Sequence, residues 1–315
     1  MAIMWRVLPI LLLLCGCTLT TAAEPTATVV HLKEMPAPSE ILKLRDQHKD
    51  SNRFFILPEG FELRENVEFA RDGDRVLAMD IMYPAKSTSS GKPVPLLMEI
   101  TCDNANRMGS GSLLFCHDTL LENAMTAGFA VAMVDHPVRS PYKGIDDPMP
   151  ACVERMKLAV KKLREVGPEL RLSGKIGAIG FSRGAPFAAV LAAQGDVQAA
   201  LVHGNRFDYL DLLSNDPMLA RFEKAWGKRD ENRDKWAAHG AVQYLTKAAA
   251  PMFLNTSNTE SAEYRDGVAK FEKQLTDRGI EHVYQVDEDD RGHRVSTDPK
   301  TLASIYQFFH KHLDE

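Results

Sequence analysis

The sequence predicts an α/β protein with a mostly parallel sheet of about eight strands and helices on both faces. Two observations carry this prediction. Short apolar runs alternate with helical patterns of about 10–20 residues, which is typical of parallel strands joined by helices. A serine also stands at the junction of one such strand and helix, in the run Gly180-Phe-Ser-Arg-Gly184.

The individual elements follow from the spacing of apolar residues. Alternating apolar and polar residues at 61–70 and 76–83, around Asp72-Gly73-Asp74, predict an antiparallel hairpin. Apolar runs predict further strands at residues 95–101, 129–134, 175–180, 197–202, 251–254 and 282–286. Helical periodicity predicts helices at residues 112–127, 148–166, 187–193, 262–278 and 299–312, and a small helical insertion at about 207–246. Asp298 and Pro299 fit the cap and first residue of the last helix.

The N-terminal residues have the pattern of a secretory signal peptide. A short basic start precedes an apolar run at 7–14 and small residues that end at Ala23, and this run is too short to span a bilayer. Cleavage after Ala23 would release a soluble protein. The run Leu14-Cys15-Gly16-Cys17 also resembles a bacterial lipobox, in which residues 1–16 are removed and Cys17 is lipidated. Both routes predict an exported protein, either periplasmic, extracellular or anchored to a membrane as a lipoprotein.

The segment at 24–53 is polar, contains three prolines and shows little periodicity. It is therefore predicted to be a flexible tether with one helix at 39–45. Residues 54–315 are predicted to form a single domain that includes the helical insertion, because no linker interrupts their pattern.

Composition narrows the range of partners and ligands. The chain carries a formal net charge of -5 and 44% hydrophobic residues, and without a long basic block it is not expected to bind nucleic acid. Beyond the signal peptide it contains Cys102, Cys116 and Cys152. Cys102 and Cys116 could form a disulfide in an exported protein, or all three could be unpaired. No CxxC or HExxH spacing occurs, so no metal site is expected.

The serine in the glycine-rich turn, Ser182, is the candidate nucleophile. A hydroxyl becomes a useful nucleophile when it projects from the backbone beside a base. The pattern G-x-S-x-G between a strand and a helix does this, because Gly180, Gly184 and Ala185 leave room for a sharp turn. The alternative is an incidental serine in a glycine-rich turn.

A base and an acid are expected after later strands. His293 lies in the polar loop between the last strand and the last helix, and such loops carry the chemistry of α/β sheets. Glu260 is the first acid after the strand at 251–254, whereas Glu263 and Asp266 fall on the following helix. Glu260 is therefore the favoured acid, with Glu263 and Asp266 left as alternatives.

From about Phe61 to its C-terminus the chain resembles the α/β-hydrolase superfamily. It is most similar to secreted esterases of the feruloyl and acetyl-xylan type and to dienelactone-hydrolase-like enzymes. The resemblance is carried by residues 76–84, 180–184, 251–260 and 291–293. It implies a cofactor-independent serine hydrolase that cleaves carboxylic esters of small molecules or carbohydrates, with Ser182, Glu260 and His293 as a catalytic triad in the order found in this family.

The segment expected to complete the oxyanion hole departs from the family pattern. Many such esterases carry a His-Gly-Gly-Gly run there, but this chain has Thr101-Cys-Asp-Asn104. The backbone N–H groups of Arg183 and of Cys102 or Asp103 are the candidate donors. Two other functions remain open. A prolyl-oligopeptidase-like peptidase is disfavoured because the sequence holds no large propeller domain. A catalytically weak hydrolase-like binding protein is favoured by the altered loop and disfavoured by the retention of Ser182, His293 and an acid.

Overall fold

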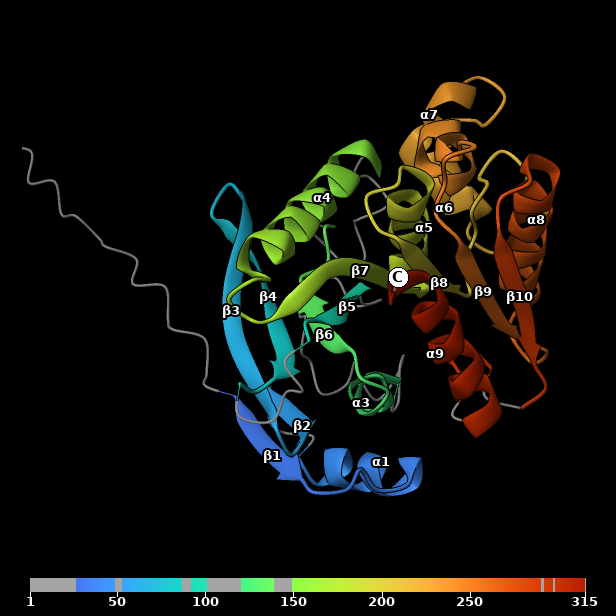
Figure 1. Ribbon diagram of the computed structural model, residues 1–315. Coiled ribbons are helices and arrows are strands. Elements are labelled where there is room, and N and C mark those ends of the chain that lie inside the picture. The colour runs from blue at the N-terminus through green and yellow to red at the C-terminus, as the bar shows by residue number, and fades with distance from the viewer. Residues whose placement is uncertain are drawn as a thin grey trace, which may run out of the picture.

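A sheet of eight strands forms the centre of the molecule, in the order β10-β9-β8-β7-β5-β6-β4-β3 (Figure 1). The computed structural model describes residues 27–48, 53–86, 92–100, 120–138, 149–289, 292–296 and 298–314. The strands are β3 (Phe61–Asp72), β4 (Arg75–Pro84), β5 (Val94–Ile100), β6 (Ala130–Val134), β7 (Leu172–Phe181), β8 (Ala199–His203), β9 (Met252–Ser257) and β10 (His282–Asp287). The predicted eight-stranded sheet is thus confirmed.

Most of the sheet is parallel, as predicted. Every neighbouring pair from β10 across to β6 runs in parallel. Strands β3 and β4 form the expected antiparallel hairpin, and β4 pairs antiparallel with β6. The hairpin turns at Gly73, whose φ of +64° favours glycine. The parallel strands therefore bring their carboxyl ends, and the loops that follow them, to one edge of the sheet.

Helices cover both faces of the sheet (Figure 1). One face carries α4 (Met149–Val166), α5 (Ala185–Ala193) and α8 (Ala262–Arg278), and the other carries α3 (Leu120–Thr126) and α9 (Pro299–Leu313). Successive strand residues alternate between the two cores: Leu96 and Met98 of β5 pack in the first, and Leu97 packs in the second. Strand β6, which is buried at every position, therefore reads as an unbroken apolar run.

The last helix begins where the sequence predicts. The carboxylate of Asp298 accepts hydrogen bonds from the backbone N–H groups of Lys300 and Thr301, at 3.2 and 3.3 Å. Pro299 follows as the first helical residue. This cap fixes the end of the loop between β10 and α9, the loop that carries His293.

The N-terminal segment packs against the domain, and this corrects part of the tether prediction. Strand β1 (Thr28–Leu32) pairs in parallel with β2 (Phe54–Pro58), and α1 (Pro38–Gln47) lies between them in sequence. Ile41 is fully buried in a small core formed with β2. Arg45 of α1 forms a buried ion pair with Glu122 of α3, the two side chains being 4% and 2% exposed. Residues 28–47 are thus part of the folded domain.

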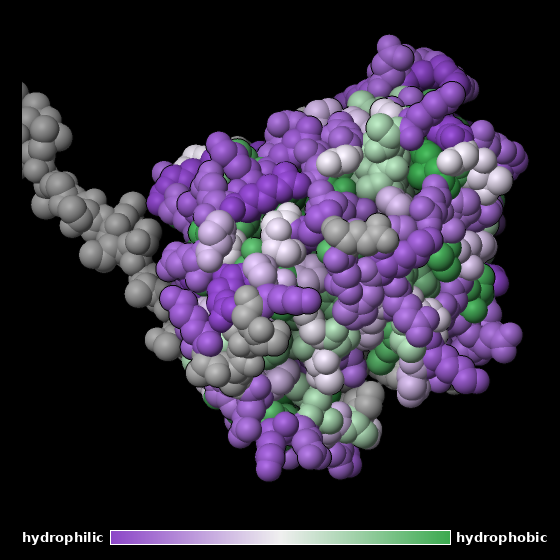
Figure 2. Space-filling model, viewed as in Figure 1, coloured by the Kyte–Doolittle hydropathy of each residue, from purple (hydrophilic) through white to green (hydrophobic). Residues whose placement is uncertain are grey.

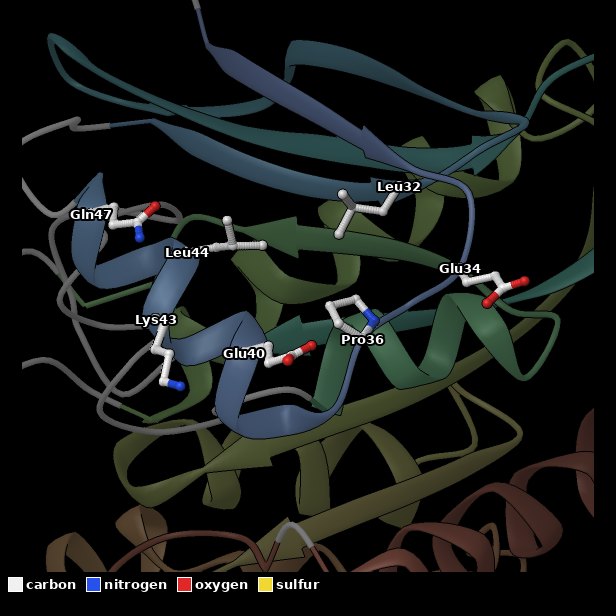
Figure 3. A pocket seen from close by; sticks show the side chains of 7 residues that line it. All are labelled: Leu32, Glu34, Pro36, Glu40, Lys43, Leu44 and Gln47. Atoms are coloured by element: carbon white, nitrogen blue, oxygen red, sulfur yellow. The ribbon is translucent and has the colours of Figure 1, made fainter.

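A cavity of about 370 Å³ lies beside α1 (Figure 3). Its lining combines apolar and charged side chains: Leu32, Glu34, Pro36, Glu40, Lys43, Leu44 and Gln47. None of these residues belongs to the candidate triad. The cavity therefore lies in the N-terminal segment, outside the site at the carboxyl edge of the main sheet.

The predicted insertion is only partly helical. It contains α6 (Leu219–Trp226), α7 (Arg233–His239) and a 3₁₀ turn, η3 (Ala241–Tyr244). Phe222, Trp226 and Trp236 form a buried aromatic cluster of its own, as expected for structural aromatics rather than for a stacking surface. Arg206 joins the insertion to the domain through a buried ion pair with Asp216, at 2.5 Å.

The face seen in Figure 2 is mainly hydrophilic, with hydrophobic residues in small groups. None of the helices in the described part of the chain combines the length and apolar character needed to cross a bilayer. Cys152 is buried and is not part of a disulfide among the described residues. The signal peptide, the lipobox at Cys17, and Cys102 and Cys116 lie outside the described residues.

Candidate active site

Ser182 occupies a strained turn at the carboxyl end of β7. The strand ends at Phe181, a 3₁₀ turn (η2, Ser182–Gly184) follows, and α5 begins at Ala185. Ser182 has a φ of +49°, in the left-handed region that non-glycine residues rarely adopt. Such a conformation costs about 1–3 kcal/mol and persists only where surrounding packing enforces it. The turn thus has the backbone geometry expected of a nucleophile elbow.

Close packing of strand against helix explains the small residues around this serine. A Cβ atom on Gly180 would lie 2.6 Å from Cβ of Ala188 and 2.7 Å from Cα of Ala185. Real side chains do not approach so closely, so any residue larger than glycine at 180 would push α5 away from β7. The predicted reason for Gly180 is therefore confirmed by the packing.

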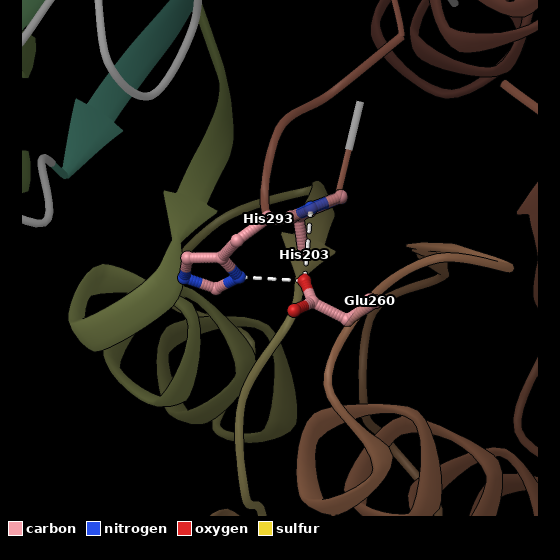
Figure 4. A group of neighbouring side chains, drawn as sticks. All are labelled: His203, Glu260 and His293. Carbon is pink, nitrogen blue, oxygen red and sulfur yellow. Dashed lines mark hydrogen bonds and ion pairs between the residues drawn. The ribbon is translucent and has the colours of Figure 1, made fainter. Parts of the chain in front are cut away.

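Glu260 and His293 meet at the same edge of the sheet. Glu260 follows β9, His293 follows β10, and Nδ1 of His293 lies 2.6 Å from Oε2 of Glu260 (Figure 4). The backbone N–H of Ser261 donates to the other carboxylate oxygen at 2.9 Å. The alternative acids pair elsewhere: Glu263 with Arg206 at 3.8 Å, and Asp266 with Lys270 at 2.9 Å. Of the three acids, Glu260 is thus the one hydrogen-bonded to His293.

The two loops that carry this pair are joined to each other. The hydroxyl of Thr259 accepts a hydrogen bond from the backbone N–H of Gly292 at 3.0 Å. The hydroxyl of Ser257 donates to the backbone carbonyl of Asp289 at 3.1 Å. These contacts flank Glu260 and His293 and fix the spacing between the carboxylate and the imidazole.

The environment keeps Glu260 ionised. Its burial acts to raise its pKa, but the hydrogen bond from His293, the charge of His293 and the N–H of Ser261 outweigh this, so the pKa lies below its usual value. A carboxylate held in this way fixes the imidazole with Nδ1 as the hydrogen-bond donor. Nε2 of His293 is left without a hydrogen-bond partner among the described residues, and is free to act as a base.

Aromatic rings and a glycine surround His293. The ring centroid of Tyr264, on α8, lies 4.7 Å from that of His293, and Phe181 lies 4.9 Å away. Gly204, with φ +50°, passes so close that a Cβ atom there would lie 2.8 Å from Oε2 of Glu260 and 2.9 Å from Nδ1 of His293. Because Phe181 immediately precedes Ser182, this packing brings the histidine to the end of the strand that bears the serine.

Two residues of this region were not predicted from the sequence. Asn205 donates a side-chain hydrogen bond to the backbone carbonyl of Ser182 and so holds the strained turn. His203, at the end of β8, is buried; its ring stacks on Phe181 at 4.7 Å, and its Nε2 lies 3.8 Å from Oε2 of Glu260. Burial and the charge of His293 lower the pKa of His203 to about 4. The only signal in the sequence is their position directly after a predicted strand.

Part of the predicted oxyanion hole can be placed. Arg183 follows Ser182 within η2 at the surface, so its backbone belongs to the turn as predicted. Cys102 and Asp103, the other candidate donors, lie outside the described residues.

No protein-family model and no curated protein matches the sequence, but the fold is similar to those of solved structures. A truncated carbohydrate esterase from gut microbiota has a TM-score of 0.65 at 16% identity, over 81% of this chain and 97% of that one. An acylaminoacyl peptidase from Pyrococcus horikoshii has a TM-score of 0.63 at 15% identity, and the match covers 82% of this chain and 42% of the peptidase. An α/β hydrolase enzyme from a Medee basin deep-sea metagenome library has a TM-score of 0.56 at 12% identity, and the match covers 82% of this chain and all (100%) of that enzyme. At these identities the similarities concern the fold.

Proposed function

We propose that this chain, which has the α/β-hydrolase fold of these structures, is a serine hydrolase that cleaves carboxylic esters. The observation that carries the proposal is the 2.6 Å hydrogen bond between Glu260 and His293, beside the strand end that bears Ser182 on a strained turn. A nucleophile, a base and an orienting acid on three neighbouring loops are the groups that acyl transfer requires.

In the proposed reaction Ser182 Oγ attacks the acyl carbon while Nε2 of His293 takes its proton. The backbone N–H groups of Arg183 and of Cys102 or Asp103 stabilise the oxyanion. His293 then protonates the departing alcohol, and water hydrolyses the acyl-enzyme by the reverse sequence of proton transfers. Glu260 stabilises the imidazolium that forms in each half-reaction. None of these steps calls for a cofactor.

Acyl groups on carbohydrates are the proposed substrate class, supported by the sequence resemblance and by the similarity in fold to a carbohydrate esterase. A peptidase is the second candidate, because the acylaminoacyl peptidase shares the fold to a comparable degree. The two reactions use the same triad and differ in the leaving group, an alcohol or an amine. Substrate comparison therefore separates them.

The test combines active-site labelling with a substrate panel. The purified chain is expected to be labelled by a fluorophosphonate probe, and to hydrolyse aryl esters and acetylated or feruloylated sugars faster than matched peptide amides. Faster cleavage of amides would replace the esterase proposal with the peptidase. A folded chain that is neither labelled nor active on either class would contradict both and favour a binding protein.

We also propose that the chain is exported and reaches its substrates by the signal at residues 1–23. Mass spectrometry of the protein from a bacterial host is expected to find either a diacylglycerol-modified Cys17 or a free N-terminus at Glu24. Cys17→Ala should abolish the lipid and leave the second route intact. A mature protein that still begins at Met1 would contradict export.

A further inference from the structure

The buried nitrogen of His203 is not used by the proposed reaction. The side chain is 1% exposed, and its Nε2 has no hydrogen-bond partner among the described residues. It points toward Oε2 of Glu260 at 3.8 Å, beyond hydrogen-bonding distance (Figure 4). A buried polar atom without a partner is costly, which suggests that this atom has a ligand.

A chain of hydrogen bonds fixes which nitrogen of His203 carries the proton. The carboxylate of Asp287 can only accept hydrogen bonds, and its Oδ2 accepts one from Nδ2 of Asn255 at 3.0 Å. The amide of Asn255 therefore presents its oxygen to Nδ1 of His203 at 2.6 Å, and that nitrogen must be the donor. Nε2 of His203 is left with a lone pair aimed at the Glu260 carboxylate. Two electron-rich atoms facing each other in a buried space make a suitable position for a cation.

His293 supplies a third ligand atom. Nε2 of His203, a carboxylate oxygen of Glu260 and a ring nitrogen of His293 all lie within 4.8 Å of one another. Zn²⁺ bonds of about 2.0–2.1 Å place tetrahedral ligand atoms roughly 3.3 Å apart. Oε2 of Glu260 lies 2.6 Å from Nδ1 of His293 and 3.8 Å from Nε2 of His203, distances on either side of that value. His293 is 25% exposed and on a loop, so it is the ligand that can adjust.

We propose that His203, Glu260 and His293 form an inhibitory binding site for a divalent transition-metal ion such as Zn²⁺. Two imidazoles and one carboxylate form a donor set suited to this class of ion and unsuited to Mg²⁺ or Ca²⁺, which prefer oxygen. Asn255 on His203 and the backbone N–H of Ser261 on Glu260 provide the outer hydrogen bonds that orient metal ligands.

Binding there would switch off the proposed hydrolase, and this consequence rests on the proposed function. The ion takes the lone pair of Nδ1 of His293, whose proton moves through solvent to Nε2, so the ring stays neutral and no electron is transferred. A protonated Nε2 cannot accept the proton of Ser182. Glu260, bound to the ion, no longer orients the imidazole for catalysis. Metal and proton transfer thus compete for the same ring.

The test measures binding apart from activity. Full-length protein treated with EDTA is titrated with Zn²⁺ by calorimetry, as wild type and as Ser182→Ala. Both are expected to bind a single ion with equal affinity, because Ser182 supplies no ligand. Ester hydrolysis by the wild type should fall in proportion to occupancy and return with EDTA. Binding without any hydrolase activity would contradict the proposed function alone, whereas activity without binding would contradict the metal site alone.

His203→Gln removes one of the three ligands. Loss of even an outer hydrogen-bond partner of a ligand costs about 10–100-fold in metal affinity, so Zn²⁺ binding should weaken by about 100-fold or more. His282→Gln is the matched control: it removes a partly buried histidine outside the proposed site, 3.3 Å from Glu272, and should leave affinity unchanged. Undiminished binding by His203→Gln, or binding lost in His282→Gln, would assign the ion to another place and overturn the proposal.

Because His203 is buried, a second measurement avoids any dependence on its replacement. Pulsed electron paramagnetic resonance of Cu²⁺ bound to Ser182→Ala counts the coordinating imidazoles directly. Coupling to two imidazoles is expected from His203 and His293. Coupling to one or none would overturn the site even if His203→Gln failed to fold.

Discussion

Replacing Ser182 with alanine is expected to lower kcat for aryl ester hydrolysis by about 10⁴-fold or more and to leave the fold intact. In the proposed mechanism the hydroxyl oxygen forms the acyl-enzyme, and no other group in the turn can take its place. The methyl side chain of alanine fits wherever the serine side chain does. Steady-state kinetics measure the loss, and far-UV circular dichroism checks the fold.

Ser173→Ala is the matched control, because it makes the same chemical change at an exposed position near the start of β7. It should leave kcat unchanged. If purified Ser182→Ala kept activity within tenfold of the wild type, the serine mechanism would be wrong, whatever the fold.

Replacing Glu260 with glutamine should lower kcat by about 10²–10⁴-fold with little change in KM. The amide has the shape of the carboxylate but lacks the charge that stabilises the imidazolium in the transition state. The lowered pKa of Glu260 means that this charge is present at neutral pH in the wild type. Initial rates at several substrate concentrations give kcat and KM separately and so test whether kcat alone changes.

Two neighbouring substitutions serve as controls. Glu263→Gln and Asp266→Asn lie on α8, where these acids pair with Arg206 and Lys270, and both should have little effect on kcat. If Glu260→Gln left kcat unchanged while Glu263→Gln or Asp266→Asn lowered it severely, the orienting acid would be one on α8 and not Glu260.

The fold was predictable because its signals are local. Strands buried on both faces produce apolar runs such as 129–134, and a helix cap such as Asp298 depends on residues two or three positions away. The turn at Ser182 was predictable for the same reason, since Gly180 and Gly184 lie beside it in the sequence. The α/β-hydrolase fold predicted from these patterns is confirmed.

The features that could not be predicted depend on which strands and loops are neighbours in the fold. Phe181 ends β7, His203 ends β8 and Asn255 lies within β9, and the three are side by side in the strand register. Apart from its place after a predicted strand, nothing in the sequence marks His203. The hydrogen bond from Asn205 to Ser182 likewise joins loops that no motif connects. Within the predicted tether the helix at 39–45 is present as α1. The prediction of a flexible segment missed the pairing of β1 with β2 and the packing of α1 on β2, contacts that local composition does not reveal.

The ordered N-terminal segment limits how far the folded domain could reach from a lipid anchor. With the domain beginning at Thr28, the eleven residues from Cys17 could span at most about 40 Å, whereas a free chain from Cys17 to Phe54 could span about 130 Å. A lipid on Cys17 would thus confine the proposed hydrolase to a thin layer above the bilayer. Esters on nearby envelope polymers would meet it at high local concentration, and those deeper in the surroundings would have to diffuse to it.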